Sequence, residues 1–252
     1  MFGSCCFNEG DMKVTLGTGT FLDVNMKNNA HGSAAGLYPL IGWRLNNEIV
    51  YLVEGACNDT GSLIQWLLKA GIVQNPDETS SLAYELEHND GVYFIPAFSG
   101  LGPPISDDNA ATGFIGLKAT STKQHMIRAI LESIVFRITL LFNMVISETG
   151  YKIKRICVDG GVANNDFVCQ LLANILGVQV ERPSSTEMTT LGVAFMAGLK
   201  SGIWNSTNEL QQFRKLNKTF QPASDENVHK TYIKEFNMWL RAVERFKSWY
   251  VR

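Results

Sequence analysis

The sequence lacks the residue patterns that mark several specialised classes of protein. Its 252 residues include only 5 cysteines and 7 prolines, and its formal net charge is −2. No two cysteines have the Cys-x-x-Cys spacing, and no histidine stands at a metal-ligand spacing from a cysteine, which argues against a structural zinc site. Acidic and basic residues are mixed along the chain, so the sequence contains no cluster of basic residues that would attract a nucleic acid.

Long hydrophobic runs and an export signal are missing as well. The longest apolar run, residues 191–199, contains glycine and has about half the length that a membrane span needs. The first residues show neither a basic leader nor an apolar stretch behind it. We therefore expect a cytoplasmic protein without a membrane span. In that compartment its cysteines should be reduced thiols: Cys5, Cys6, Cys57, Cys157 and Cys169.

The sequence does contain enough apolar residues for a sizeable core, since 45% are hydrophobic and 18% are charged. No repeat, linker or low-complexity stretch divides residues 1–252, which favours one domain. Hydrophobic periodicity and turn residues predict strands at 14–16, 20–22, 91–98, 154–158 and 178–180, and a hairpin within 38–53. They predict helices at 62–68, 77–87, 121–149, 166–176, 190–202 and 225–252.

The predicted helix over 190–202 is rich in small residues. Gly192, Ala194, Ala197 and Gly198 carry almost no side chain, so this helix is expected to pack closely against a neighbour. The predicted terminal helix is amphipathic, and Trp239 and Trp249 are expected on its apolar face.

A strand, a glycine-bearing turn and a second strand stand near the start of the chain. Gly17, Thr18 and Gly19 form the turn, and two glycines around a hydroxyl can bend the backbone tightly and present N–H groups to a phosphate. A plain hairpin is the alternative, because glycine turns between strands are common. Phe21, in the second strand, is by itself typical of a core residue.

A second glycine turn follows the strand at 154–158. Asp159, Gly160 and Gly161 precede the helix at 166–176, and a helix N-terminus behind such a turn favours an anion or a ribose. The alternative is a turn that only requires a positive φ. Two glycine turns at strand ends together indicate a nucleotide site more strongly than either turn alone.

Six ordered blocks carry a resemblance to a known family. They are Gly-Thr-Gly-x-Phe at 17–21, Gly-x-x-Ile-Gln-Trp-Leu at 61–67, Phe-x-Pro-Ala-Phe-x-Gly-Leu at 94–101, His-x-x-Arg-Ala-x-Leu-Glu at 125–132, Asp-Gly-Gly at 159–161 and Leu-Gly-x-Ala at 191–194. The sequence resembles the glycerol kinases among the FGGY carbohydrate kinases, nearest to the glycerol kinase 5 branch. The resemblance implies an α/β domain of the actin-like, ribonuclease H-like fold, with a mixed sheet flanked by helices.

The resemblance also implies roles for individual residues in binding ATP, with Mg²⁺ as the accompanying cation. Gly17, Thr18 and Gly19 would face the terminal phosphates, and Gly61 and Gln65 would line the nucleotide cleft. Gly160, Gly161 and Asn165 would hold the adenosine end, and Phe21 would lie against the carbon face of glycerol. From the residues alone, Gln65 could equally be a solvated helix residue.

The resemblance further implies that residues 1–252 correspond to a C-terminal nucleotide-binding domain. The family's catalytic aspartate, its metal-linked phosphate loop and most of its glycerol contacts would then lie upstream of Met1, in an N-terminal domain that this sequence does not include. The expected function is transfer of the γ-phosphoryl group of ATP to glycerol by the full-length enzyme, with an inactive isolated chain. A non-catalytic nucleotide-binding module, a kinase of a related polyol and a homo-oligomeric full-length protein stay open as alternatives.

Overall fold

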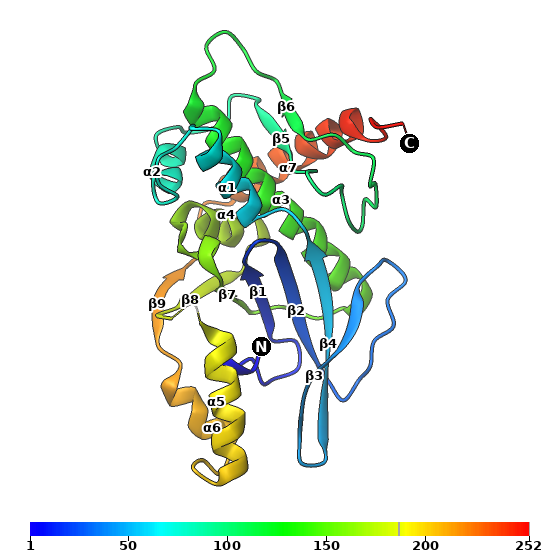
Figure 1. Ribbon diagram of the computed structural model, residues 1–252, viewed down its shortest axis with the longest axis vertical. Coiled ribbons are helices and arrows are strands. Elements are labelled where there is room, and N and C mark those ends of the chain that lie inside the picture. Colours follow the sequence, from blue (N-terminus) through cyan, green and yellow to red (C-terminus); the bar gives the residue numbers. More distant parts are fainter. Residues whose placement is uncertain (186, 252) are drawn as a thin grey trace.

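A seven-stranded mixed sheet organises the chain, with strands in the order β3-β4-β2-β1-β7-β8-β9 (Figure 1). The computed structural model describes residues 1–185 and 187–251. Strands β1, β7 and β8 are parallel, whereas β2, β3, β4 and β9 run antiparallel to their neighbours. The strands are β1 Met12–Leu16, β2 Thr20–Lys27, β3 Tyr38–Leu45, β4 Glu48–Cys57, β7 Arg155–Asp159, β8 Gln179–Pro183 and β9 Leu216–Phe220. A separate two-stranded antiparallel sheet pairs β5 Tyr93–Ile95 with β6 Gly113–Ile115.

The longest helix, α3 Lys123–Thr149, packs against the sheet. A capping box starts it, because the His125 side chain accepts from the Thr122 backbone N–H at 3.2 Å, and Gly150 ends it in the left-handed conformation. Its length and apolar composition would suffice for a membrane span, but 78% of its most apolar 18-residue stretch is buried inside the protein. Helix α3 is therefore the central core helix.

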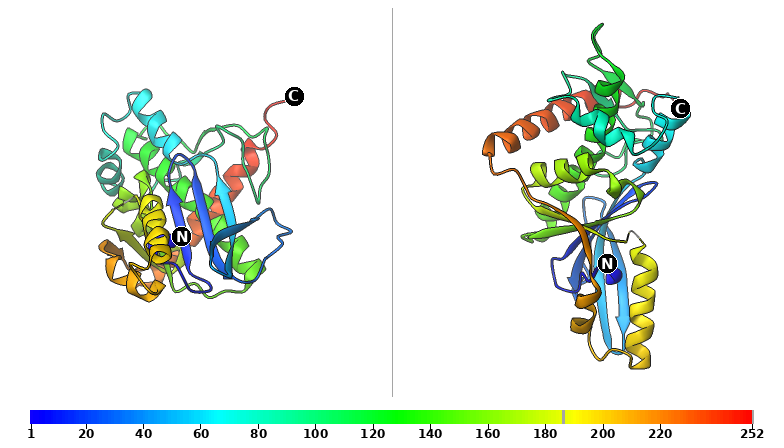
Figure 2. Two further views of the ribbon diagram at one scale, coloured as in Figure 1. Left: turned by 60° about the horizontal axis from the view of Figure 1, so that its bottom comes forward. Right: turned by 90° about the vertical axis from the view of Figure 1, so that its left-hand side faces the viewer.

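The remaining helices surround the sheet on both sides (Figure 2). They are α1 Gly61–Lys69, α2 Glu78–Tyr84, α4 Asp166–Leu176, α5 Met188–Ser201, α6 Thr207–Leu210 and α7 Glu226–Phe246, with short 3₁₀ helices η1 Phe2–Ser4, η2 Gly161–Asn164 and η3 Gln211–Phe213. Helices α2, α4 and α7 pack with α3 at one end of the molecule, whereas α5 packs against η1 at the other end.

The two faces of the sheet differ because successive strand residues point to opposite sides. Met12, Val14 and Leu16 of β1 and Leu22 of β2 belong to the main core on the α3 side. On the opposite face, a smaller apolar cluster joins the N-terminal segment to β3, β4, α5 and α6. Its buried members are Phe2, Cys5, Phe7, Trp43, Val50, Leu52, Phe195 and Leu210.

Most of the predicted elements are confirmed, and the predicted helix at 166–176 coincides with α4. The predicted terminal helix is too long, since α7 ends at Phe246 and Trp249 lies beyond it with 67% of its surface exposed. Arg252, its last predicted residue, lies outside the described residues. The short polar strand β9 and helix α6 were not predicted at all.

The close-packing prediction for α5 is half right. A Cβ on Gly192 would lie 2.9 Å from the Gly3 backbone nitrogen, and one on Gly198 would collide with the Trp204 ring. Ala194 and Ala197, however, are exposed on the other side of the helix. Only the glycines therefore serve the close approach.

Candidate functional site

A cavity of about 520 Å³ opens where the two glycine turns, α1 and α2 meet. This volume is in the range of small-molecule sites. Residues from four separate segments line it: Gly17 and Thr18; Gly61, Ser62, Ile64 and Gln65; Pro76, Asp77, Thr79 and Ser80; and Gly161, Val162, Asn164 and Asn165. The fold thus brings both predicted turns to one site.

The first turn is held against the start of α1 by backbone hydrogen bonds. Gly61 N–H donates to the Gly17 carbonyl at 2.9 Å, and Thr60 N–H donates to the Thr18 carbonyl at 3.1 Å. A Cβ on Gly61 would lie 2.6 Å from the Gly17 oxygen, so only glycine permits this approach. Over residues 1–185 and 187–251, no protein acceptor takes the Thr18 N–H, and Thr18 is exposed. Its N–H and hydroxyl can therefore donate to a ligand.

The second turn touches the first directly. Gly160 has a φ of +88°, and a Cβ there would lie 2.5 Å from the Leu16 oxygen at the end of β1. Glycine is thus needed both for the backbone conformation and for the contact. Gly161 differs, because a Cβ on it would meet nothing within 4 Å. It borders open cavity space.

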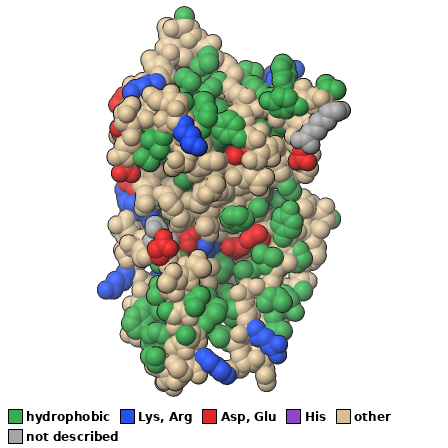
Figure 3. All heavy atoms as spheres, viewed as in Figure 1, with side chains coloured by type: hydrophobic (Ala, Val, Ile, Leu, Met, Phe, Trp, Pro, Cys, Tyr) green, Lys and Arg blue, Asp and Glu red, His purple; other side chains and the backbone are tan. Residues whose placement is uncertain are grey.

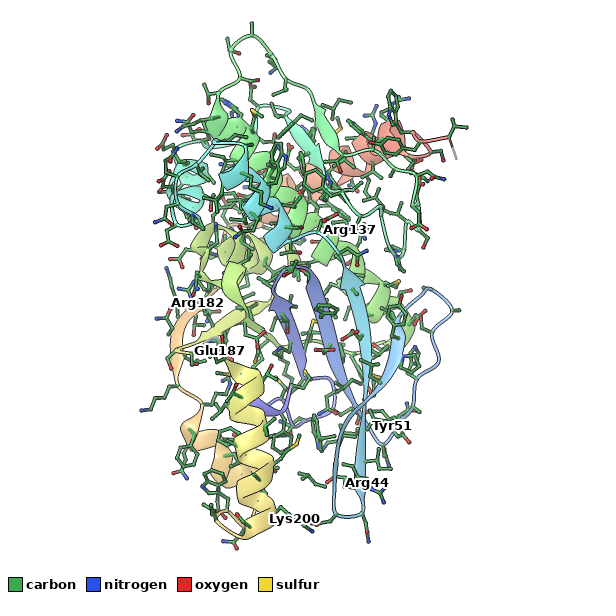
Figure 4. The ribbon with its side chains drawn as sticks, viewed as in Figure 1. Arg44, Tyr51, Arg137, Arg182, Glu187 and Lys200 are labelled. Atoms are coloured by element: carbon green, nitrogen blue, oxygen red, sulfur yellow. The ribbon has the colours of Figure 1, made fainter. Side chains whose placement is uncertain are left out.

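Arg182 of β8 supports the second turn from behind (Figure 4). Its guanidinium donates to the Ala163 carbonyl at 2.8 Å and pairs with Asp166 at 2.8 Å. Asp166 opens α4, where a carboxylate also interacts favourably with the helix N-terminus. The turn, β8 and α4 are therefore fixed together at the cavity.

Asn165 caps α4 and at the same time connects it to α2. Its side-chain oxygen accepts from Val168 N–H at 3.1 Å, and its amide nitrogen donates to the Thr79 hydroxyl at 2.9 Å. Next to it, Phe167 N–H donates to the Ser80 hydroxyl at 3.1 Å. Thr79 and Ser80 thus shape the wall opposite the turns.

Six of the eight residues predicted for the cofactor line this cavity: Gly17, Thr18, Gly61, Gln65, Gly161 and Asn165. The other two do not line the cavity. Gly160 contacts the end of β1, and Gly19 packs against the Cys57 carbonyl oxygen, which would lie 2.6 Å from a Cβ added to Gly19. Sequence reasoning missed the α2 residues Thr79 and Ser80, because no pattern signals a contact between segments 86 residues apart.

Phe21 lies outside the cavity, on the sheet face opposite α3. With 43% of its surface exposed, it is not a core residue, so the interpretation from the sequence alone is wrong. Its ring is available to a ligand on that face.

The cavity lining is nearly neutral. Asp77, which is exposed, is the one charged side chain among the described residues that line it. An anion there would be bound through backbone N–H groups and hydroxyls, as at other glycine turns.

A buried ion pair lies beneath the two turns. Lys13 Nζ of β1 is 2.9 Å from Asp159 Oδ1 at the end of β7, and Lys13 also donates to the Thr15 hydroxyl. Both charged side chains are less than a tenth exposed. The pair ties the strand that leads into the first turn to the strand that leads into the second.

Two acidic residues, one on β2 and one on β4, lie on the same face of the sheet as this ion pair. Asp23 is the cross-strand partner of both Lys13 and Glu54. Burial, followed by the proximity of Asp23, raises the pKa of Glu54 to about 7, and burial raises the pKa of Asp23 despite the attraction of Lys13. Figure 3 shows acidic and basic side chains gathered across the middle of the molecule.

Solved structures define the fold class. The crystal structure of Plasmodium falciparum glycerol kinase with ADP superposes with a TM-score of 0.90 at 32% identity, covering 97% of this chain and 49% of that one. Xylulose kinase from Lactobacillus acidophilus matches with a TM-score of 0.82 at 24% identity, over 97% of this chain and 49% of that one. The chain has the actin-like ATPase fold of sugar kinases, as predicted.

The sequence comparisons define the family. The domain described as "FGGY family of carbohydrate kinases, C-terminal domain" matches residues 12–201, so the chain belongs to the FGGY family. Glycerol kinase 5 of Danio rerio is 43% identical over 99% of this chain and 48% of its own length. Glycerol kinase 2 of Thermotoga maritima is 38% identical over 99% of this chain and 50% of its own length. The chain thus spans about half the length of these relatives.

Proposed function

We propose that residues 1–252 are the nucleotide-binding C-terminal domain of a glycerol kinase-type enzyme. The full-length enzyme would transfer the γ-phosphoryl group of ATP to a hydroxyl of glycerol and would keep its catalytic aspartate in an N-terminal domain. The observation that carries the proposal is the cavity formed jointly by the turns at 17–19 and 159–161. Membership of the FGGY family and the similarity to a glycerol kinase solved with ADP support it.

In this proposal the two turns hold opposite ends of ATP. The exposed Thr18 N–H and hydroxyl donate to the terminal phosphates, while Gly61 and Gln65 line the middle of the cleft. Gly161 leaves space for the adenosine end, and Asn165 holds α2 and α4 together beside this space through its hydrogen bond to Thr79. Backbone donors fixed before the ligand arrives suit phosphoryl transfer, in which positioning and charge stabilisation dominate.

The nearly neutral lining implies that phosphate charge is offset by a cation. Mg²⁺ bound to the phosphates would neutralise charge that develops on the transferred group. The described residues contain no group of three or more His, Cys, Asp or Glu that could hold a metal ion. We therefore assign Mg²⁺ to the nucleotide phosphates and to the N-terminal domain rather than to a carboxylate cage in this chain.

The acceptor would lie on the sheet face opposite α3, next to Phe21. An exposed aromatic ring offers an apolar surface to the carbon side of glycerol while its hydroxyls turn elsewhere. A related polyol could use the same ring, so Phe21 supports the polyol class more than glycerol itself.

A non-catalytic nucleotide-binding module is the second candidate function. The buried carboxylates close to the turns are already engaged: Asp59 accepts from the Ser62 hydroxyl at 2.9 Å and from Ser99 N–H at 3.0 Å, and Asp159 pairs with Lys13. Neither stands ready as a base for an acceptor hydroxyl. We accordingly expect no turnover of glycerol and ATP by the isolated chain.

Calorimetry with Mg-ATP tests the nucleotide site. The chain should release heat on binding, and Gly161→Trp should abolish it because the indole fills the cavity without straining the backbone. Gly32→Trp is the matched control, since Gly32 also has nothing within 4 Å of an added Cβ but lies in a remote loop. Equal heats from the chain and from Gly161→Trp would overturn the assignment. Glycerol-dependent ADP release well above background would instead contradict the missing-base argument.

A further inference from the structure

Helix α2 carries one wall of the cavity but has few anchors of its own. It is seven residues long, and of these only Thr79 and Ala83 are buried. A helix this short is not stable by itself in water, so its position depends on tertiary contacts. Its first half presents Thr79 and Ser80 to the cavity, and both accept hydrogen bonds from the start of α4. The contacts of its second half therefore decide how firmly this wall is fixed.

Arg128 of α3 binds the carbonyl end of α2. Its Nη1 donates to the Leu86 carbonyl and, at 3.4 Å, to the Ala83 carbonyl. The last carbonyls of a helix have no partner inside the helix and carry partial negative charge, so a guanidinium there both caps and attracts them. Arg128 is buried, which shields these contacts from water. It thus fixes the end of α2 that does not line the cavity.

The same guanidinium also contacts α4. Its central carbon lies 5.2 Å from the centroid of the Phe167 ring, which is a cation–π contact. Tyr84 of α2 packs edge-on against that ring, with the two centroids 5.2 Å apart, and its hydroxyl donates to the Asp166 carbonyl at 3.3 Å. The backbone N–H of Phe167 donates to the Ser80 hydroxyl at 3.1 Å. Phe167 therefore connects Arg128 to the cavity wall.

A buried polar network holds Arg128 in this orientation. Its Nε donates to Glu132 Oε1 at 2.8 Å, one helical turn further along α3. Asn89 donates to the other Glu132 oxygen at 2.8 Å, and both Glu132 and Asn89 are buried. Burial raises the pKa of Glu132, against the charge of Arg128 and the hydrogen bonds from Arg128 and Asn89. Because every member of the network has a partner, the guanidinium is fixed before any ligand binds.

We propose that Arg128 is a positioning residue of the nucleotide site: it holds α2 against α4 from outside the cavity, so that Thr79 and Ser80 are in place before the nucleotide enters. No residue of the block at 125–132 lines the cavity, so Arg128 acts through α2 and Phe167. A site whose wall is fixed in advance loses less free energy to ordering when the ligand binds. This role of the His-x-x-Arg-Ala-x-Leu-Glu block rests on the proposed function.

Calorimetry with Mg-ATP on two variants tests this role. Arg128→Met keeps much of the apolar stem but removes the charge that caps α2 and contacts Phe167, so the Kd for Mg-ATP should rise about tenfold. This variant also leaves Glu132 buried without its charge partner, which lowers the stability of the whole chain. The double variant Arg128→Met with Glu132→Gln removes that second effect. In thermal unfolding it should recover stability, but its affinity for Mg-ATP should stay low.

Arg137→Met is the matched control. Arg137 is also a buried arginine of α3, but it donates to the Gly102 and Pro103 carbonyls, at 3.1 and 3.2 Å, in a loop that does not line the cavity. Its loss should lower stability and leave the Kd for Mg-ATP unchanged. The proposal is overturned if the double variant binds Mg-ATP as tightly as the unchanged chain, or if Arg137→Met binds it as weakly as Arg128→Met.

Hydrogen exchange without ligand distinguishes failure of this proposal from failure of the proposed function. The amides of residues 79–84 should exchange about tenfold faster in the double variant, whereas those of residues 62–68 in α1 should not change. If the unchanged chain gives no heat with Mg-ATP, the proposed function fails, and the exchange of residues 79–84 still decides whether Arg128 holds α2. Unchanged exchange at residues 79–84 would overturn the positioning role whatever the calorimetry shows.

Discussion

The two faces of the central sheet are built from the same strands but differ in the kind of side chain they carry and in its exposure. On the α3 side, β1 and β2 contribute Met12, Val14 and Leu22, all at most 1% exposed. On the other side, the alternate residues are Lys13, an ion pair partner, and Phe21, an exposed ring. One face is thus closed by apolar packing, whereas the other combines a smaller apolar cluster with a buried ion pair and an exposed aromatic ring.

This difference separates stability from function. The α3 face gains free energy from burial alone, and its residues could be exchanged for others of similar volume. The opposite face keeps costly buried charges, which are tolerated because Lys13 and Asp159 are paired under the two turns. Mutations on each face should therefore differ in their effect on stability.

The largest loss should follow removal of the buried cation. Lys13→Met leaves Asp159 buried without its partner, which should cost about 3–5 kcal/mol of unfolding free energy. Urea unfolding measures it. The double variant Lys13→Met with Asp159→Asn should recover much of the loss; if it stays as unstable as the single variant, the pairing argument is wrong.

Neighbouring residues on opposite faces should differ clearly. Leu22→Ala, in the core, should lower the unfolding free energy by about 3 kcal/mol because it opens a cavity under α3. Phe21→Ala, one residue earlier on the exposed face, should cost about 0.5 kcal/mol or less. Equal losses in thermal or urea unfolding would contradict the division between the faces.

The acidic pair should give a smaller, pH-dependent effect. Because the pKa of Glu54 rises from 4.5 to about 7 on folding, the folded chain binds more protons than the unfolded chain between these values. Stability should therefore fall as pH rises through this window, by about 1 kcal/mol once screening of this partly exposed side chain is allowed for. Urea unfolding at pH 5 and pH 8 measures the difference.

Glu54→Gln should flatten this pH dependence, since glutamine cannot ionise beside Asp23. Glu48→Gln, at the exposed start of the same strand, should leave it unchanged. A steeper dependence in Glu54→Gln would mean that another group dominates the window.

The sequence predicts those parts of the fold that depend on local chemistry. The Gly17–Gly19 turn and the bounds of α4 follow from turn residues and helical periodicity, and α3, predicted over residues 121–149, begins two residues later, at Lys123. The predicted end of α7 is wrong. The amphipathic pattern continues to Trp249, but it does not show that the helix stops packing against the rest of the protein at Phe246.

The site was only partly predictable for a similar reason. Gly17, Gly61 and Gly161 belong to motifs that can be recognised in the sequence. Thr79 belongs to no such motif; it lines the cavity, where a hydrogen bond from Asn165 holds its side chain.

A crystal structure of the chain with Mg²⁺ and a non-hydrolysable ATP analogue would show directly whether the two glycine turns hold the nucleotide. We expect phosphates at the Gly17–Gly19 turn, within hydrogen-bond distance of Thr18, and adenosine between Gly161 and α2. A nucleotide bound elsewhere, or bound in the reverse direction with its base at Thr18, would contradict this expectation.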